Sequence, residues 1–288
     1  MTRLSVNVNK VATLRNSRGG AVPSVVEAVR VCVESGAPGI TVHPRADERH
    51  IRRADVLEVA EALAPVRDRV EYNIEGDPRP DLVELVEKVR PDQCTLVPVR
   101  PGEITSEAGW PADTPKDALA DIITRFHACG VRVSVFVDPE PAPIEWAAEL
   151  GADRVELYTE PYARAFERGG EALDASLAKY RFAVEHAAAS GLAVNAGHDL
   201  DLTNLPTFLQ LPHIAEVSIG HALMARALFV GLRSGNYGFS LTAGPSFLEC
   251  CRYGRENAQQ SIHRRFERAA RSTQSRAQGC AGAPWREA

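Results

Sequence analysis

The stretch GITVHPRADERHIRRADVLEVAEALAP, residues 39–65, contains a β-strand followed by a helix. Its first part is a short apolar run that ends in His43 and Pro44. From Arg53 onward, the apolar residues recur at the spacing of one helix face. Another β-branched run follows at Arg69–Glu75. A strand, a helix and a strand in this order predict two parallel strands covered by the connecting helix.

The same unit recurs along the chain, at the length of roughly 30 residues that is typical of such a unit. Expected strands lie at Leu4–Lys10, Gly39–Pro44, Arg69–Glu75, Gln93–Val99, Arg132–Asp138, Arg154–Thr159, Ala193–His198 and Glu216–His221. Eight such units predict an α/β protein with a (β/α)8 barrel over residues 1–234. A doubly wound open sheet is the alternative, and the count of eight favours the barrel.

Two segments do not fit the repeat. Glu160–Ala189 is longer than one helix, so we expect an extra helical insertion before the seventh strand, broken at Gly169-Gly170. The pattern stops near Ser234, and we expect residues 235–288 to be a C-terminal extension that is partly disordered. Its arginines could contact an anionic partner.

Composition limits the partners. The formal net charge of −5 gives no global case for binding nucleic acid or a membrane surface. No apolar run has the length of a signal peptide or a membrane span. None of the six cysteines forms a CxxC pair, so neither a zinc site nor a redox dithiol is indicated. These observations predict a cytoplasmic protein with reduced thiols.

Ionisable side chains gather where the expected strands end, which is where barrels of this kind carry their active sites. Four of the eight histidines lie there, together with Glu75: His43, His50, His198 and His221. Any one of these histidines could be structural, but several at one face of the barrel indicate proton transfer near neutral pH.

Two features of the same loops suit anions. Lys10, Arg18, Arg45 and His50 are basic residues in loops at this face, although a single loop arginine could equally form a surface ion pair. Gly220 ends the last strand and a helix begins near Ala222, so free backbone N–H groups can face a phosphate. The segment ATLRNSRGG, residues 12–20, suits a long loop that reaches a phosphate.

Six motifs, in order and one at nearly every strand end, resemble those of the pyridoxine 5′-phosphate synthase family. They are VNVNKVATLRNSRGG, GITVHPRADERHI, NIEG, LVPV with ITSEAGW, VNAGHDL and SIGHALMARAL. The resemblance spans residues 4–232. It implies a barrel that assembles as a homo-octamer and uses neither a metal nor an organic cofactor. It also implies a transferase that condenses 3-amino-2-oxopropyl phosphate with 1-deoxy-D-xylulose 5-phosphate, giving pyridoxine 5′-phosphate, a form of vitamin B6, with phosphate and water.

The resemblance also implies residue roles. Glu75 would remove protons around the imine and enamine steps, His198 would be the acid that helps phosphate depart, and His43 would be a base in later steps. The residues implied to hold the amino substrate are Asn7, Arg18, Gly220 and His221. Those implied to hold the deoxyxylulose phosphate are Arg45, His50 and Thr105.

The chain departs from the commoner family pattern at three places. Asn9-Lys10 replaces Asp-His at a position that contacts deoxyxylulose phosphate, Asp199 replaces a glycine, and Val99 replaces a glutamate. The lysine raises the local positive charge, which Asp199 could offset. We expect a branch of the family with retained activity, in which Asn9, Lys10 and Asp199 contact substrate.

Two other functions remain open at this point. A metal-dependent sugar phosphate isomerase or epimerase could use His43, Glu75, His198 and His221 as ligands. It would need a further carboxylate from Asp138 or Asp199. A non-catalytic phosphate-binding barrel is the other possibility, although binding alone does not need this set of proton-transfer groups.

Overall fold

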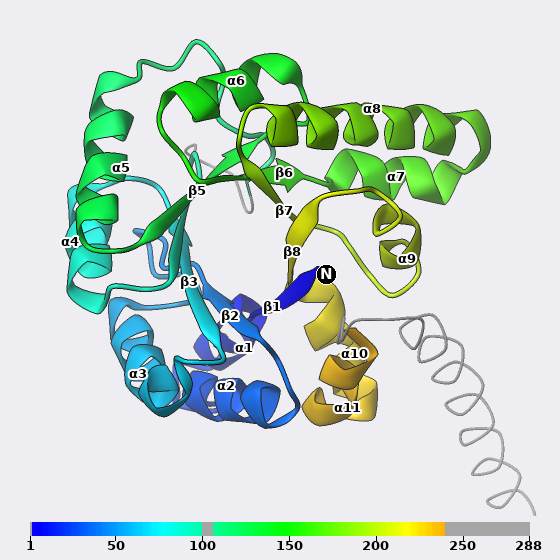
Figure 1. Cartoon of the computed structure of the whole chain (residues 1–288). Helices are drawn as coiled ribbons and strands as arrows, with labels where there is room; N and C mark the ends of the chain where they lie inside the picture. The colour runs from blue at the N-terminus through cyan, green and yellow to red at the C-terminus, as the bar shows by residue number, and fades with distance from the viewer. Residues whose placement is uncertain (1, 100–105, 240–288) are drawn as a thin grey trace, which may run out of the picture. The chain divides into compact units, whose positions relative to one another are not determined.

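The computed structural model describes residues 2–99 and 106–239, which contain a closed barrel of eight parallel strands (Figure 1). The strands pair in chain order, and β8 closes the barrel by pairing with β1. They are β1 (Arg3–Asn7), β2 (Gly39–Val42), β3 (Glu71–Gly76), β4 (Gln93–Leu96), β5 (Arg132–Val137), β6 (Arg154–Tyr158), β7 (Ala193–Gly197) and β8 (Ile214–Ile219). The predicted (β/α)8 fold is confirmed, and the open doubly wound sheet is excluded.

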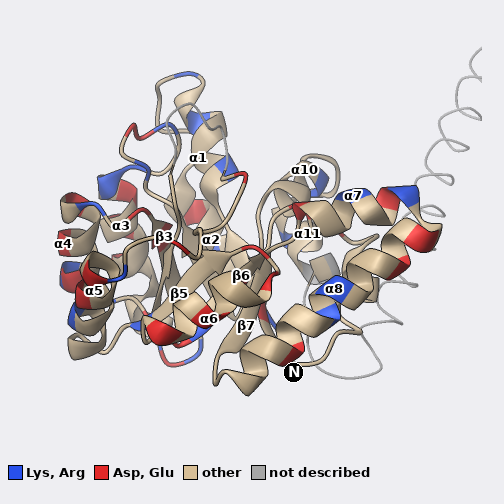
Figure 2. Ribbon diagram, turned by 90° about the horizontal axis from the view of Figure 1, so that it is seen from above, with Lys and Arg blue, Asp and Glu red and all other residues tan. Residues whose placement is uncertain are grey.

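Helices surround this barrel, and many of the Lys, Arg, Asp and Glu residues lie on them (Figure 2). They are α1 (Asn9–Asn16), α2 (Val25–Glu34), α3 (Arg53–Leu63), a 3-10 turn η1 (Ala64–Val66), α4 (Pro80–Val89), α5 (Asp117–Ala128), α6 (Pro141–Glu149), α7 (Glu160–Arg168), α8 (Gly170–Ala189), α9 (Leu205–Phe208), α10 (His221–Val230) and α11 (Leu232–Phe239). Helix α2 shows the usual construction. Ser24 caps its N-terminus by accepting the Glu27 N–H, and its inner face buries Ala28, Val29 and Cys32.

The first strand is shorter than expected, and the segment after it is a helix. We expected a strand to Lys10 and a long loop over residues 12–20, but β1 ends at Asn7 and α1 occupies Asn9–Asn16. The Asn7 side chain accepts the Asn9 N–H (3.0 Å), which turns the chain at once into the helix. Val11 and Ala12 then bury one face of α1, so the segment gains more from packing than it would as an open loop.

The expected insertion before the seventh strand is present as α7 and α8, separated at Gly169. Gly169 and Gly170 both have positive φ, 67° and 52°, which a glycine adopts without the cost that a side chain brings. The rings of Tyr162 and Tyr180 pack edge to face with centroids 5.9 Å apart. The Tyr180 hydroxyl donates a hydrogen bond to the Tyr158 carbonyl. The Tyr162 hydroxyl donates one to the Asn204 carbonyl (2.8 Å). The insertion is thereby anchored to the C-terminal end of β6 and to the loop after β7.

The last described helix, α11, runs to Phe239, past the boundary at 234 that the sequence suggests. Buried Asn236 donates to the carbonyls of Cys32 (3.1 Å) and Ser35 (3.4 Å) at the end of α2. The end of the barrel sequence is thus fastened to the helix that precedes β2. The expected extension, residues 235–288, lies outside the described residues from 240 onward. None of the helices described in residues 2–99 and 106–239 is long and apolar enough to cross a membrane.

The barrel interior is partly polar, whereas branched apolar side chains fill most barrels of this type. Near the middle, the hydroxyls of Ser5 and Thr41 lie 2.6 Å apart. Asn73 donates to Thr41 (3.3 Å) and accepts from Thr95 (3.1 Å). All four side chains are buried, and their hydrogen bonds with one another offset the loss of water.

Candidate active site

A large open pocket of about 1420 Å³ lies at the C-terminal ends of the strands. It is lined by the predicted site residues Asn7, Asn9, Lys10, His43, Arg45, His50, Glu75, His198, Asp199, Gly220 and His221. Arg18 is exposed after α1 and does not line the pocket. Thr105 lies outside the described residues, while its neighbour Ser106 lines the pocket.

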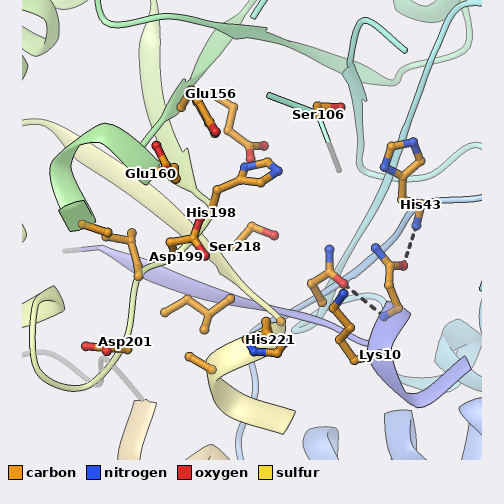
Figure 3. A pocket seen from close by; sticks show the side chains of 18 of the residues that line it. Lys10, His43, Ser106, Glu156, Glu160, His198, Asp199, Asp201, Ser218 and His221 are labelled. Carbon is orange, nitrogen blue, oxygen red and sulfur yellow. Dashed lines mark hydrogen bonds between the residues drawn. The ribbon is translucent and has the colours of Figure 1, made fainter. Parts of the chain in front are cut away.

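The centre of one wall is a pair formed by His43 and Glu75, at the ends of β2 and β3. His43 Nδ1 lies 3.8 Å from Glu75 Oε2. Asn7 from β1 and Ser218 from β8 each donate to this carboxyl group, at 3.5 Å. The backbone N–H of His43 donates to Asn9 Oδ1 (2.9 Å), which ties the pair to the start of α1 (Figure 3). Four neighbouring strands therefore fix the position of the pair.

The two groups of the pair have pKa values displaced in opposite directions. Burial raises the pKa of Glu75 to about 8, the charge of Glu216 acts in the same direction, and the Ser218 hydrogen bond acts against both. Burial lowers the pKa of His43 well below its usual value, assisted by His50 and Arg45. At neutral pH the resting pair therefore holds its proton mainly on Glu75, and His43 is a neutral base.

The raised pKa of Glu75 predicts a stability difference that depends on pH. The folded carboxyl is mostly protonated up to about pH 8, whereas the unfolded one ionises near pH 4.5, so Glu75 contributes less to stability as pH rises between these values. We expect Glu75→Gln to gain stability relative to the unmodified protein between pH 6 and pH 9, by on the order of 2–3 kcal/mol. Denaturant unfolding of both proteins at the two pH values measures this difference. A difference that does not change with pH would contradict the displaced pKa.

Glu156 on β6 is a further buried carboxyl group in the pocket, and it was not among the site residues predicted from the sequence. Burial raises its pKa well above the usual value, and the charges of Glu75 and Glu216 act in the same direction. Because side chains alternate along a strand, Arg154, Glu156 and Tyr158 share one face of RVELY. The sequence signal for Glu156 is its position two residues before Tyr158, on the same face of the strand. It is found only when the inner positions of the strand are considered together with its last residue.

His198, at the end of β7, lies on the pocket wall opposite His43 (Figure 3). Its ring packs against Phe136 and Tyr158, with centroid distances of 5.0 and 5.5 Å, and its buried Nδ1 has no hydrogen-bond partner among the described residues. Burial lowers the pKa of His198, and Asp199 partly offsets this effect. A buried ring nitrogen without a partner beside a cavity is available to a bound substrate.

The backbone at His198 and Asp199 is strained. Both residues have positive φ, 80° and 54°, which is uncommon for residues other than glycine. The Thr159 hydroxyl donates to the His198 carbonyl (2.5 Å), and the Asn204 side chain donates to the Asp199 carbonyl (2.9 Å). Gly197 has no room for a side chain, because a Cβ there would lie 2.6 Å from a carboxyl oxygen of Glu156. Neighbouring groups therefore hold an unfavourable conformation that places His198 on the cavity wall.

One side of the pocket is basic and carries Lys10, Arg45 and His50. His50 Nδ1 accepts the Ile51 N–H (2.9 Å), so the proton of the neutral ring is on Nε2. Burial and the charges of Arg45 and Lys10 lower the pKa of His50 to about 4. These charges repel one another, so a bound anion would stabilise the group. The acidic residues Glu160, Asp199 and Asp201 lie elsewhere around the pocket (Figure 3).

A second anion-binding region is formed by the N-terminus of α10. Gly220 precedes the helix, which begins at His221, one residue before the expected start. A Cβ on Gly220 would approach atoms of Asn7 to 3.1 Å, so glycine allows the helix end to lie close against β1. Unpaired N–H groups and the helix dipole favour an anion at this end.

The residues considered as metal ligands do not converge. In the described part of the chain, no three His, Cys, Asp or Glu side chains are grouped so that they could hold a metal ion. His43 and Glu75 form one pair, but His198 lies on the opposite wall (Figure 3). The ligand set considered for a metal-dependent isomerase is therefore not assembled.

The fold and the pocket together define a class: a (β/α)8-barrel enzyme whose acid–base groups share one pocket with two anion-binding regions. A model of the family described as pyridoxal phosphate biosynthesis protein PdxJ matches residues 4–235. The pyridoxine 5′-phosphate synthases of Porphyromonas gingivalis and Bacteroides thetaiotaomicron are each 52% identical to the chain over 233 residues. These matches cover 81% of the chain and 94% and 95% of the two relatives. The chain belongs to the PdxJ family, as its motifs predict.

Solved structures similar to the chain show the fold alone, because their sequence identity is low. TrpF from Jonesia denitrificans superposes with a TM-score of 0.53 at 14% identity, over 84% of this chain and all of that one. Phosphoribosyl anthranilate isomerase from Thermus thermophilus gives a TM-score of 0.50 at 18% identity, over 81% and 99% of the two chains.

Proposed function

We propose that this protein is a pyridoxine 5′-phosphate synthase. It condenses 3-amino-2-oxopropyl phosphate with 1-deoxy-D-xylulose 5-phosphate and releases pyridoxine 5′-phosphate, phosphate and water. The observation that carries the proposal is the buried His43–Glu75 pair, which faces His198 across a pocket with two anion-binding regions. Membership of the PdxJ family supports the same reaction.

Each anion-binding region takes one of the two phosphorylated substrates. The basic side, with Lys10, Arg45 and His50, holds the deoxyxylulose phosphate, assisted by Asn9 and Thr105. The N-terminus of α10, with Asn7, Gly220 and His221, holds the amino substrate, assisted by Arg18, and Asp199 contacts substrate in the same pocket. Both regions border the same pocket as the acid–base groups, so the amine and ketone can meet there.

The displaced pKa values support a division of roles among the acid–base groups. Attack of the amine on the ketone forms an imine and releases water. The positive charge of the protonated imine lowers the pKa of Glu75 from about 8 and makes its carboxylate available to remove the next proton. His198 donates a proton to the departing phosphate, whose negative charge offsets the effect of burial on this imidazole. His43, neutral at this pH, acts as the base in the later closure and dehydration.

From the family resemblance we propose a homo-octamer that needs no metal or organic cofactor. From the net charge and the cysteine pattern we propose a cytoplasmic location, with neither nucleic acid nor membrane as a partner. The free thiols of Cys32, Cys94 and Cys129 are consistent with a reducing compartment.

The test is an assay of the purified protein with both phosphates and a metal chelator, following pyridoxine 5′-phosphate by chromatography. Product formation that requires both substrates supports the proposal. Conversion of the sugar phosphate alone, lost with the chelator, would instead establish an isomerase. Binding of both phosphates without any turnover would establish the non-catalytic barrel.

A further inference from the structure

Helix α1 carries a buried arginine that does not line the pocket. Arg15 is only 6% exposed and directs its guanidinium away from solvent, toward the start of α3. Both of its terminal nitrogens bind the carboxylate of Asp55, with Nη2 2.8 Å from Oδ2. Nη2 also donates to the backbone carbonyl of His50 (3.2 Å). The two-pronged contact needs the planar fork of an arginine, which a lysine cannot reproduce.

Asp55 and Asn16 extend this contact along the β2–α3 loop. Asp55 lies in the first turn of α3 and accepts the N–H of Arg52 (2.8 Å). Asn16 donates through one amide nitrogen toward the carbonyls of Arg49 (3.2 Å) and His50 (2.8 Å), and it accepts from Arg15 Nε (3.0 Å). Arg15 and Asn16 together therefore bind the backbone of the loop on the side away from the pocket.

The loop held in this way supplies much of the basic side of the pocket. Arg45 and His50 come from it, and Lys10 comes from the first turn of α1 itself. One helix thus carries the pocket residue Lys10 at its beginning and, a turn and a half further on, Arg15, which holds the backbone of the loop at His50. The distances among these three groups depend on how α1 is joined to α3. The imidazole Nε2–H of His50 can point at an anion only while its backbone stays in place.

We infer that Arg15 is a positioning residue for the basic side of the pocket. It acts through Asp55 and the His50 carbonyl, and it sets the affinity for the phosphorylated sugar without contacting it. This inference rests on the proposed function, because that function assigns the sugar phosphate to this side. The amino substrate, held at the N-terminus of α10, should not depend on Arg15.

The experiment compares Arg15→Lys with the unmodified full-length chain. The lysine keeps the charge but loses the fork, so we expect the KM for deoxyxylulose phosphate to rise about tenfold, as loss of a charged hydrogen bond implies. We expect kcat and the KM for the amino substrate to change less than twofold. Calorimetric binding of deoxyxylulose phosphate alone, which needs no turnover, should show the same loss of affinity.

Two further variants keep the test decisive. Tyr72→Phe removes the hydrogen bond from the Tyr72 hydroxyl to the Val56 carbonyl (3.1 Å), which fastens the same helix α3 without touching the loop. It should lower the melting temperature and leave both KM values unchanged. If Arg15→Lys does not fold, Asn16→Ala, which removes the bonds to the loop carbonyls, should raise only the KM for the sugar.

The outcomes separate the proposed synthase function from the positioning role of Arg15. An unmodified protein that makes no product refutes the proposed function, whatever the variants do. A working enzyme in which Arg15→Lys leaves the sugar affinity unchanged, or raises both KM values equally, overturns the positioning role alone.

Discussion

Replacing Glu75 with glutamine is expected to lower kcat by roughly 10²–10⁴-fold, the usual contribution of a general acid–base group. Glutamine has the shape of the protonated carboxyl; its single side-chain oxygen can accept from Asn7, and its NH2 group can donate to the Ser218 hydroxyl, so the pocket should keep its structure. It cannot take up the proton that the carboxylate removes once the positively charged imine is bound. Steady-state assays with both substrates measure the loss, with both KM values expected to stay within a few-fold.

A matched control is Glu61→Gln, the same change on the exposed face of α3. Its activity should equal that of the unmodified enzyme. If Glu75→Gln retained more than a tenth of the original kcat, Glu75 could not be the base, and His43 or Glu156 would have to take its place.

Replacing His198 with alanine should lower kcat by a similar factor of roughly 10²–10⁴, but at a different step. Without the imidazole, the pocket lacks the side chain that the proposed mechanism uses to give a proton to the departing phosphate. We therefore expect release of inorganic phosphate, measured colorimetrically, to fall together with product formation. Condensation of the two substrates should still occur, so a phosphorylated intermediate should become detectable by mass spectrometry.

His213→Asn provides the control for this substitution. His213 is exposed before β8 with a φ of 58°, a conformation that asparagine also tolerates. Normal phosphate release by His198→Ala would remove His198 from the role of acid.

Much of the fold and of the pocket could be predicted because the information is local. Each strand and helix is short and patterned, and the pocket residues mostly stand at strand ends. Arg15 could not be recognised in this way, because its partner Asp55 lies forty positions further on and only the folded barrel brings them together. Glu156 was missed because a carboxyl group within an apolar strand is ordinarily unfavourable, and only the polar barrel interior accommodates it.

For Arg18 the expectation from the sequence and the position in the structure differ. Its position in a basic loop indicates a phosphate contact, but the unexpected helix α1 ends just before it and leaves it exposed, outside the pocket lining. Its role in binding the amino substrate stays a prediction.

The closure of β8 onto β1, and the contact of α11 with α2, have a consequence for biosynthesis. A ribosome adds roughly 5–20 residues per second, so on the order of ten seconds or more separate the appearance of β1 from that of its last partner. Throughout this interval the nascent chain exposes an unpaired edge of β1, which can pair with other chains. The edge of β1 is therefore covered only after β8 has been synthesised, and the contact of α11 with α2 forms only after the residues up to Phe239 have emerged.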